Sequence, residues 1–286
     1  MSNLVPLRPG LWLVETRLED FDVRGVVVCG RKQGVVWDTL ARPADMKGVA
    51  DLMGDLPFTV VYSHGDWDHV WGTVGLGGSW EAVLAHETCG PRFLEEIPLT
   101  LEEKRASAPG EYDGVTLVLP TRTFRNRLIL DLGGVTLELH SLPGHTPDTI
   151  VGYLPEWGIL LGGDAVEDPL PFLNPGCPVE GWSRALEEWA EALEARPHAR
   201  HRRALTLEDE GRAGVVAGSL AGTPGRGPLP SPLVIPSHGP IAGTGLLRAN
   251  ARYLRDLAEG KEPELPGKLT AFYRETHAAN RVLARG

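Results

Sequence analysis

The sequence predicts an α/β protein built from two packed β-sheets with helices on their outer faces. Short apolar or β-branched segments bounded by glycine or charged residues recur along the chain, as strands do. Both halves of the chain have strands followed by helices, and packed layers bury the apolar faces of both kinds of element. Of the 286 residues, 42% are hydrophobic and 23% charged, a composition typical of a globular chain with its own core.

Charge and composition argue against several classes of protein. The formal net charge of -10 disfavours nucleic acid and anionic membranes as partners, because both attract clustered positive charge. No apolar run approaches the roughly 20 residues that span a bilayer, and the first ten residues do not resemble a signal peptide. The widely spaced Cys29, Cys89 and Cys177 indicate a reducing compartment. We therefore expect a cytoplasmic protein with a small-molecule substrate, and a homodimer is left open.

Most of the predicted strands lie in the first two thirds of the chain. Phe58–Tyr62 is apolar enough for a buried strand, and Gly133 with Gly134 is typical of a hairpin turn between two strands. The predicted strands are Leu11–Glu15, Arg24–Cys29, Gly34–Asp38, Phe58–Tyr62, Ala82–Ala85, Arg127–Leu132, Val135–Ser141, Thr149–Leu154, Trp157–Leu161 and Leu233–Pro236.

Helices are predicted where apolar residues recur at helical spacing or where proline and glycine mark the two ends of a segment. We interpret residues 97–120, with their prolines and charged patch, as a lid-like insertion in a single domain that spans residues 1–286. We interpret the cluster Arg196–Arg203 as a solvated helix end. The predicted helices are Pro43–Asp55, Glu87–Glu96, Trp182–Ala195 and Leu205–Gly218, followed by two C-terminal helices within 245–286, Gly245–Glu259 and Pro266–Ala284.

A cluster of potential metal ligands directly follows the strand predicted at Phe58–Tyr62. Imidazole nitrogens and carboxylate oxygens are ligands that zinc, iron and manganese accept. Residues on a turn at a strand end can converge on one point, and Gly65 relieves the backbone there. The segment reads SHGDWDH, and its candidate ligands are His64, Asp66, Asp68 and His69.

Three later segments repeat this pattern of a ligand-type residue at the end of a strand, beside glycine. His145 lies in PGHT after the strand Val135–Ser141. Asp164 lies in GGD, and His238 lies in SHG, each directly after a predicted strand. If these strand ends share one edge of the sheets, the side chains would gather enough ligands for two metal ions.

In this order, the motifs HGDWDH, PGHT, GGD and SHG resemble those of the metallo-β-lactamase superfamily over about residues 10–245. The resemblance implies a four-layer αββα sandwich of two mixed sheets flanked by helices. It also implies two divalent metal ions, with zinc expected and manganese or iron as alternatives. The ligands carried over are His64, Asp66 and His145 for the first ion, Asp68, His69 and His238 for the second, and Asp164 as the bridge.

Asp66 departs from the usual H-x-H-x-D-H motif of the superfamily, which has histidine at this position. A carboxylate adds a negative charge and a harder ligand, which shifts metal preference towards manganese or iron. Asp66 can bind the metal directly or through water. Alternatively, it leaves the first site weak and the protein mononuclear.

The resemblance implies a hydrolase in which a metal-bound hydroxide attacks an ester, thioester or lactone. Asp68 would orient this nucleophile or move its proton. The alternatives are an iron-dependent oxygenase or oxidoreductase of the same fold, and a phosphodiesterase. The candidates for the substrate pocket are Phe21 at a turn, Phe172 in an apolar stretch near Asp164, and Glu167, at a position where small lactonases of the superfamily carry tyrosine.

Overall fold

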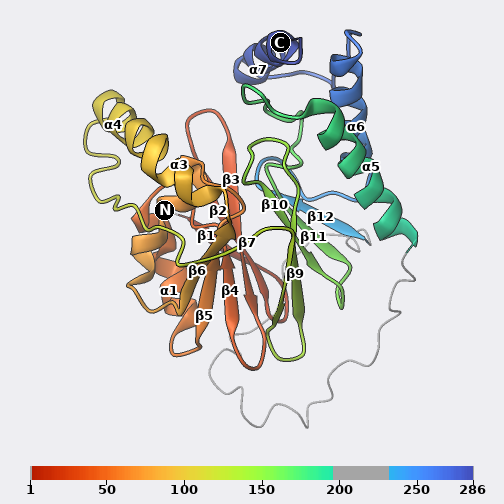
Figure 1. Cartoon of the computed structure of the whole chain (residues 1–286). Helices are drawn as coiled ribbons and strands as arrows, with labels where there is room; N and C mark the ends of the chain where they lie inside the picture. Colours follow the sequence, from red (N-terminus) through yellow and green to blue (C-terminus); the bar gives the residue numbers. More distant parts are fainter. Residues whose placement is uncertain (1, 196–231, 286) are drawn as a thin grey trace.

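The computed structural model describes residues 2–195 and 232–285 of the chain. Two β-sheets stack face to face, and helices cover the outer face of each sheet (Figure 1). The predicted four-layer α/β sandwich is therefore confirmed. The predicted helix Leu205–Gly218 and the cluster Arg196–Arg203 lie outside the described residues.

The first sheet has seven strands in sequential order, β1 to β7. Strands β1 to β4 pair antiparallel, whereas β4 to β7 pair parallel, so the carboxyl ends of β4 and β5 lie at the same edge. The strands are β1 (Asn3–Arg8), β2 (Leu11–Arg17), β3 (Asp22–Cys29), β4 (Gly34–Trp37), β5 (Phe58–Val61), β6 (Ala82–His86) and β7 (Arg122–Phe124).

The second sheet has five strands in the order β12-β11-β10-β9-β8. Only β11 and β12 pair parallel, which again brings two carboxyl ends to one edge. The strands are β8 (Arg127–Asp131), β9 (Thr136–Ser141), β10 (Ile150–Leu154), β11 (Ile159–Gly163) and β12 (Leu233–Pro236).

The helices fall into two outer layers. In Figure 1, α1, α3 and α4 lie on the side of the first sheet, and α5 and α6 lie on the side of the second, with α7 at the top of the view, beside the upper end of α6. The described helices are η1 (Pro43–Met46), α1 (Lys47–Met53), α2 (Trp67–Val70), η2 (Thr73–Leu76), α3 (Cys89–Glu95), α4 (Ile97–Ser107), α5 (Val179–Ala195), α6 (Gly245–Ala258) and α7 (Ala271–Leu283).

Three apolar layers hold this arrangement together. The central layer lies between the two sheets and includes Trp37 and Leu139. A second layer lies between the first sheet and its helices and includes Phe93, while Trp182 and Leu254 belong to the third layer, under α5 and α6. Burial of apolar surface in these layers is the main favourable contribution to folding.

The structure corrects several predicted boundaries. The helix predicted at Pro43–Asp55 is divided into η1 and α1. The last helix begins at Ala271 rather than Pro266, because Thr270 caps it by accepting a hydrogen bond from the backbone N–H of Tyr273. Strands β1 and β7 were not predicted: β1 has no fully buried residue and contains Pro6, which is unusual within a strand, and β7 has only three residues.

The segment 97–120 begins with a helix that packs into the molecule. Ile97 and Leu101 of α4, together with Tyr112 and Val115, belong to the apolar layer outside the first sheet. A role of this segment as a lid stays a prediction.

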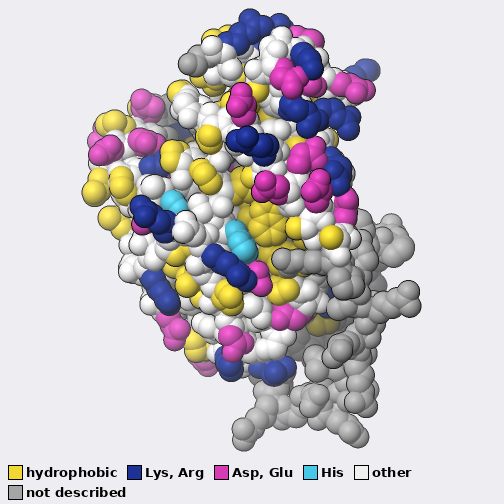
Figure 2. All heavy atoms as spheres, turned by 45° about the vertical axis from the view of Figure 1, so that its right-hand side comes forward, with side chains coloured by type: hydrophobic (Ala, Val, Ile, Leu, Met, Phe, Trp, Pro, Cys, Tyr) yellow, Lys and Arg dark blue, Asp and Glu magenta, His cyan; other side chains and the backbone are white. Residues whose placement is uncertain are grey.

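Acidic and basic side chains are interspersed over the face of the molecule that Figure 2 shows, around an apolar patch near its centre. Among the described residues, no helix combines the length and the apolar character that crossing a membrane requires.

Leu139 and Ile129 provide a matched test of the central layer, because they lie on neighbouring strands but differ in burial. Leu139 is fully buried between the sheets, whereas Ile129 is 52% exposed. We expect Leu139→Ala to lower the free energy of unfolding by about 2–5 kcal/mol, and Ile129→Ala to change it by only about 0.5 kcal/mol. Urea unfolding followed by circular dichroism measures both; equal losses would contradict this account of the core.

Candidate metal centre

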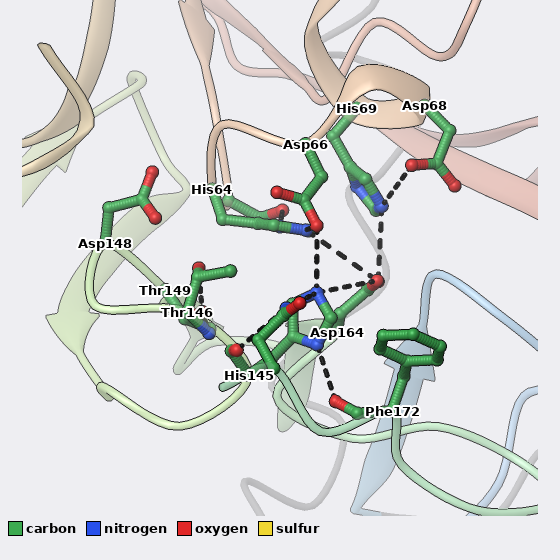
Figure 3. Close-up of polar contacts among 12 residues, drawn as sticks. His64, Asp66, Asp68, His69, His145, Thr146, Asp148, Thr149, Asp164 and Phe172 are labelled. Atoms are coloured by element: carbon green, nitrogen blue, oxygen red, sulfur yellow. Dashed lines mark hydrogen bonds and ion pairs between the residues drawn. The ribbon is translucent and has the colours of Figure 1, made fainter. Parts of the chain in front are cut away.

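The seven side chains predicted as metal ligands lie together, where four connections of the two sheets meet; Figure 3 labels all of them except His238. Parallel strands of one sheet end at a common edge, and the packing of the two sheets brings both edges together. The connections follow β5, β9, β11 and β12, and the side chains are His64, Asp66, Asp68, His69, His145, Asp164 and His238.

Asp164 stands at the centre of this cluster and contacts all four imidazoles. One carboxylate oxygen, Oδ1, lies 3.3 Å from Nε2 of His69. The other, Oδ2, lies 3.3 Å from Nε2 of His238, 3.7 Å from that of His64 and 3.8 Å from that of His145. This arrangement suits a carboxylate shared by two ions.

Two further carboxylates divide the imidazoles into two groups. Asp66 Oδ2 lies 3.1 Å from Nε2 of His145 and 3.6 Å from Nε2 of His64. Asp68, in the first turn of α2, lies 3.7 Å from Nε2 of His69 and 3.6 Å from Nε2 of His238. Each group offers three ligand atoms within 4.8 Å of one another.

Backbone carbonyls orient two of the four imidazoles. Nδ1 of His145 donates a hydrogen bond to the carbonyl oxygen of Phe172 at 2.7 Å, and Nδ1 of His238 donates to that of Asp22 at 2.8 Å. Because a carbonyl oxygen can only accept, each Nδ1 carries a proton, and each ring in its neutral form presents the lone pair of Nε2 to the site.

Asp38, which the sequence analysis placed in a strand and not in the site, orients the other two imidazoles. Its carboxylate accepts a hydrogen bond from Nδ1 of His69 at 3.0 Å, and two more from the backbone N–H and the hydroxyl of Ser63, both at 2.7 Å. The Ser63 hydroxyl therefore accepts from Nδ1 of His64, at 2.9 Å. All four rings thus turn Nε2 towards Asp164.

Burial and charge act in opposite directions on the protons of this cluster. Burial lowers the pKa of His145, but the hydrogen bond to Asp66 and the charges of Asp66 and Asp164 outweigh it and raise the pKa to about 9. In the same way, Asp164 raises the pKa of His238 to about 10 against burial. Despite its burial, Asp164 has a pKa well below its usual range, because the imidazoles of His238, His69 and His64 surround it.

The donor set fits divalent metal ions. Three of its buried polar atoms, Nε2 of His64, Nε2 of His69 and Oδ1 of Asp164, have no hydrogen-bond partner. Such unpaired atoms are costly in a protein interior, and a cation among them would satisfy all three. Imidazole and carboxylate ligands in this mixture suit zinc, iron and manganese.

The two aromatic pocket candidates lie on imidazoles of the site. The ring of Phe21 is 4.8 Å from the His238 ring, and the ring of Phe172 is 6.0 Å from the His145 ring. The C-terminal helix α7, which sequence analysis did not connect with the site, adds Phe272 at 5.3 Å from Phe21. These rings form an aromatic rim beside the ligands.

Glu167, the third pocket candidate, is only 4% exposed and lies behind the ligands, near His145 and Asp164. Burial, followed by the negative charge of Asp164, raises its pKa to about 7. One of its oxygens accepts a hydrogen bond from the backbone N–H of Phe172 at 3.1 Å, so Glu167 shapes the loop that orients His145.

Two asparagines of the C-terminal helices hold this same loop. The amide of Asn250 in α6 makes two hydrogen bonds of 2.8 Å with the backbone of Glu167. The amide of Asn280 in α7 donates to the carbonyl oxygen of Pro171 at 2.7 Å and accepts from the N–H of Leu173 at 3.0 Å. Both helices therefore support the carbonyl group that fixes His145.

Other histidines and threonines of the sequence have structural contacts. His86 bonds to Thr88 and to the carbonyl oxygen of Arg125, and His140 packs against Trp189 at 5.1 Å. The hydroxyl of Thr146 is bonded to Thr149 within its own turn. Asp38 stands at the end of a predicted strand, as the ligands do, but has no glycine beside it, so only part of the pattern that identified the ligands indicated its role.

Comparison with known proteins places the architecture in one family. The model of the metallo-beta-lactamase superfamily matches residues 20–210, more than half of the chain. A metallo-beta-lactamase from Pontibacter korlensis has a similar structure, with a TM-score of 0.58 and 18% identity over 86% of this chain and 95% of that chain. Comparison with curated proteins finds no match.

Two further solved structures are similar at comparable levels. The metallo-beta-lactamase FIM-1 from Pseudomonas aeruginosa, in its mono-zinc form, has a TM-score of 0.55 and 19% identity, covering 87% of this chain and 94% of that chain. The metallo-beta-lactamase DIM-1 has a TM-score of 0.56 and 16% identity, covering 87% of this chain and 96% of that chain. At these identities the structural likeness establishes the fold alone.

Removing the charge of Asp38 tests its role in orienting His69 and Ser63. We expect Asp38→Asn to lower zinc affinity by about 10–100-fold, as the loss of a group that orients metal ligands does, because the amide cannot accept from all three donors. Competition with a chromogenic chelator measures the affinity. The exposed Asp51→Asn is the matched control, and an Asp38→Asn variant that binds zinc as tightly as the control would contradict this role.

Metal uptake should release protons, since His145 and His238 have pKa values of about 9 and 10 in the metal-free site. Metal ions bind neutral imidazole, so protons compete with them below these values. Zinc affinity should therefore increase as the pH rises towards 9. Calorimetry of zinc binding at pH 7.5 in two buffers of different ionisation enthalpy should give different heats; identical heats would mean that the imidazoles are already neutral.

Proposed function

The chain belongs to the metallo-beta-lactamase superfamily, and on that premise we propose that it is a metal-dependent hydrolase that cleaves ester, thioester or lactone bonds. We further propose that it holds two divalent ions, zinc first among them. The observation that carries this proposal is the set of four imidazoles, each fixed at Nδ1 and each turned with Nε2 towards the shared carboxylate of Asp164.

The chemistry of the proposed reaction divides between the ions and the side chains. Divalent ions held by this cluster would lower the pKa of a bound water and polarise the carbonyl oxygen of the substrate. The carboxylate of Asp68 is in reach of both His69 and His238, and we assign it the orientation of the attacking water and the transfer of its proton. Asp164, whose pKa is well below its usual range, stays ionised and lies 3.3 to 3.8 Å from imidazoles of both ligand groups.

The surroundings of the cluster favour a neutral acyl substrate over a phosphodiester. Phe21, Phe172 and Phe272 form an apolar rim, which suits the carbon chain of an ester or lactone. Two cations on this side of the cluster are engaged with other side chains. Arg92 bonds to carboxylates, and Lys104 lies 3.8 Å from the ring centre of Trp67.

A substrate panel tests the proposed activity. We expect turnover of p-nitrophenyl esters, thioesters or lactones by the zinc-loaded protein, and little turnover of bis-p-nitrophenyl phosphate or of the β-lactam nitrocefin. His69→Ala and Asp164→Ala should abolish turnover, because each removes a proposed ligand. His140→Ala, which alters a histidine outside the cluster, should keep it. Retained activity in both ligand variants would place the reaction elsewhere.

Metal analysis of protein purified without added metal tests the proposed ions separately. Two equivalents of zinc per chain support the dinuclear proposal, and one equivalent contradicts it. Iron together with turnover that depends on O2 would favour an oxygenase or oxidoreductase instead. The carboxylate of Asp66 is the feature that supports this alternative, because it shifts the metal preference of the first site towards iron or manganese.

A further inference from the structure

Arg92, in the last turn of α3, has its guanidinium group enclosed by three carboxylates. Nη2 donates to Oδ1 of Asp66 at 2.6 Å, Nη1 donates to Oδ1 of Asp148 at 2.9 Å, and Nε donates to Glu96 at 2.9 Å. The Arg92 side chain is 14% exposed and that of Asp148 is fully buried. A buried arginine with this many charge-assisted hydrogen bonds is held in one position.

The contact with Arg92 divides the two oxygens of Asp66 between different tasks. Oδ1 faces the guanidinium. Oδ2 lies 3.1 Å from Nε2 of His145 and 3.6 Å from Nε2 of His64 (Figure 3). Only Oδ2 is therefore turned into the ligand group. A carboxylate held in this way can bind a metal through one oxygen and cannot rotate to present both.

Gly65 provides the space through which Arg92 reaches Asp66. A Cβ atom built at position 65 would lie 3.1 Å from Cδ1 of Ile97, 3.2 Å from Oδ2 of Asp148 and 3.3 Å from Nη1 of Arg92, all tighter than ordinary van der Waals contact. The glycine between His64 and Asp66 thus admits the guanidinium group against the backbone of the ligand segment.

The positive charge of Arg92 offsets a negative charge that Asp66 adds to the cluster. The resemblance places a neutral imidazole where this chain has the carboxylate of Asp66, which adds one negative charge beside Asp164 and Asp68. A guanidinium group in contact with Asp66 offsets the added charge. Because Asp148 and Glu96 share the same guanidinium, Asp66 is not fully neutralised and keeps its capacity to bind a cation.

We propose that Arg92 is a positioning residue that holds Asp66 as a one-oxygen ligand of the first metal ion, in place of an imidazole. This inference rests on the proposed function only in requiring metal ions at the cluster. It selects direct ligation by Asp66 over a water-mediated contact or an empty first site. Asp148 and Glu96 act on the metal through Arg92, by fixing the plane of its guanidinium group.

Zinc titration of variants, with zinc as the only added metal, tests the proposal independently of activity. We expect Arg92→Met to weaken one of the two zinc equivalents by about 10–100-fold and to leave the other unchanged. Arg92→Lys should give an intermediate loss, because an ammonium keeps the charge but cannot form parallel hydrogen bonds to two carboxylates. In a separate experiment, the metal-free proteins are loaded with cobalt instead of zinc. The visible absorption spectrum of cobalt-loaded Arg92→Met should differ from that of the original chain, because the spectrum reports the geometry of the ligands.

A double-variant cycle separates positioning from a general structural effect. In an Asp66→His background an imidazole replaces the carboxylate, so Arg92→Met should change zinc affinity by less than about 3-fold. Arg125→Met, which removes an exposed arginine paired with Glu87, is the matched control and should bind zinc like the original chain. Thermal unfolding and circular dichroism establish that each variant is folded.

The outcomes distinguish this inference from the proposed function. If the original chain binds zinc and is active, but Arg92→Met binds both equivalents with unchanged affinity, the role of Arg92 is wrong and the hydrolase proposal stands. An equal loss in the original and Asp66→His backgrounds also overturns the role. If the original chain binds no zinc, the metal centre itself is wrong, and this inference is overturned with it.

Discussion

The rest of the site depends on the hydrogen bonds that the carboxylate of Asp38 accepts. It is fully buried at the end of β4 and accepts three hydrogen bonds, two from Ser63 and one from His69. These bonds fix the start of the connection after β5 and the orientation of α2 relative to it. Asp38 has a positive φ of 58°, a conformation that is uncommon for residues other than glycine. Its hydrogen bonds supply the compensation that such a backbone conformation requires.

The remaining orientation of the ligands comes from parts of the chain that are far apart in sequence. His238 depends on the carbonyl group of Asp22 in the β2–β3 hairpin, and His145 depends on that of Phe172. The loop around Phe172 is in turn held by Asn250 and Asn280 in the two C-terminal helices. The geometry of the cluster is thus a property of the assembled fold, because even Ser63, which orients the adjacent His64, is itself held by Asp38 from another strand.

Sequence reasoning predicted the layers, most strands and the gathering of seven side chains, because each of these follows from a local pattern. Buried strands are apolar, and ligand-type residues stand beside glycine at their ends. The positions of Arg92 and Phe272 could not be predicted in this way. Arg92 meets Asp66 across 26 residues and Asp148 across 56, and Phe272 reaches Phe21 from the last helix. Such contacts depend on how elements pack, which local patterns do not encode.

The electrostatics of the cluster explain how it keeps its shape before a metal binds. Asp66 and Asp164 have pKa values well below their usual range despite burial, and the imidazoles of His145 and His238 have pKa values above theirs. Opposite charges therefore attract one another across the space that an ion would fill. A divalent cation bound here would displace these protons and supply positive charge in their place. In this respect Arg92 serves Asp66 as a permanent positive charge, one that metal binding does not displace.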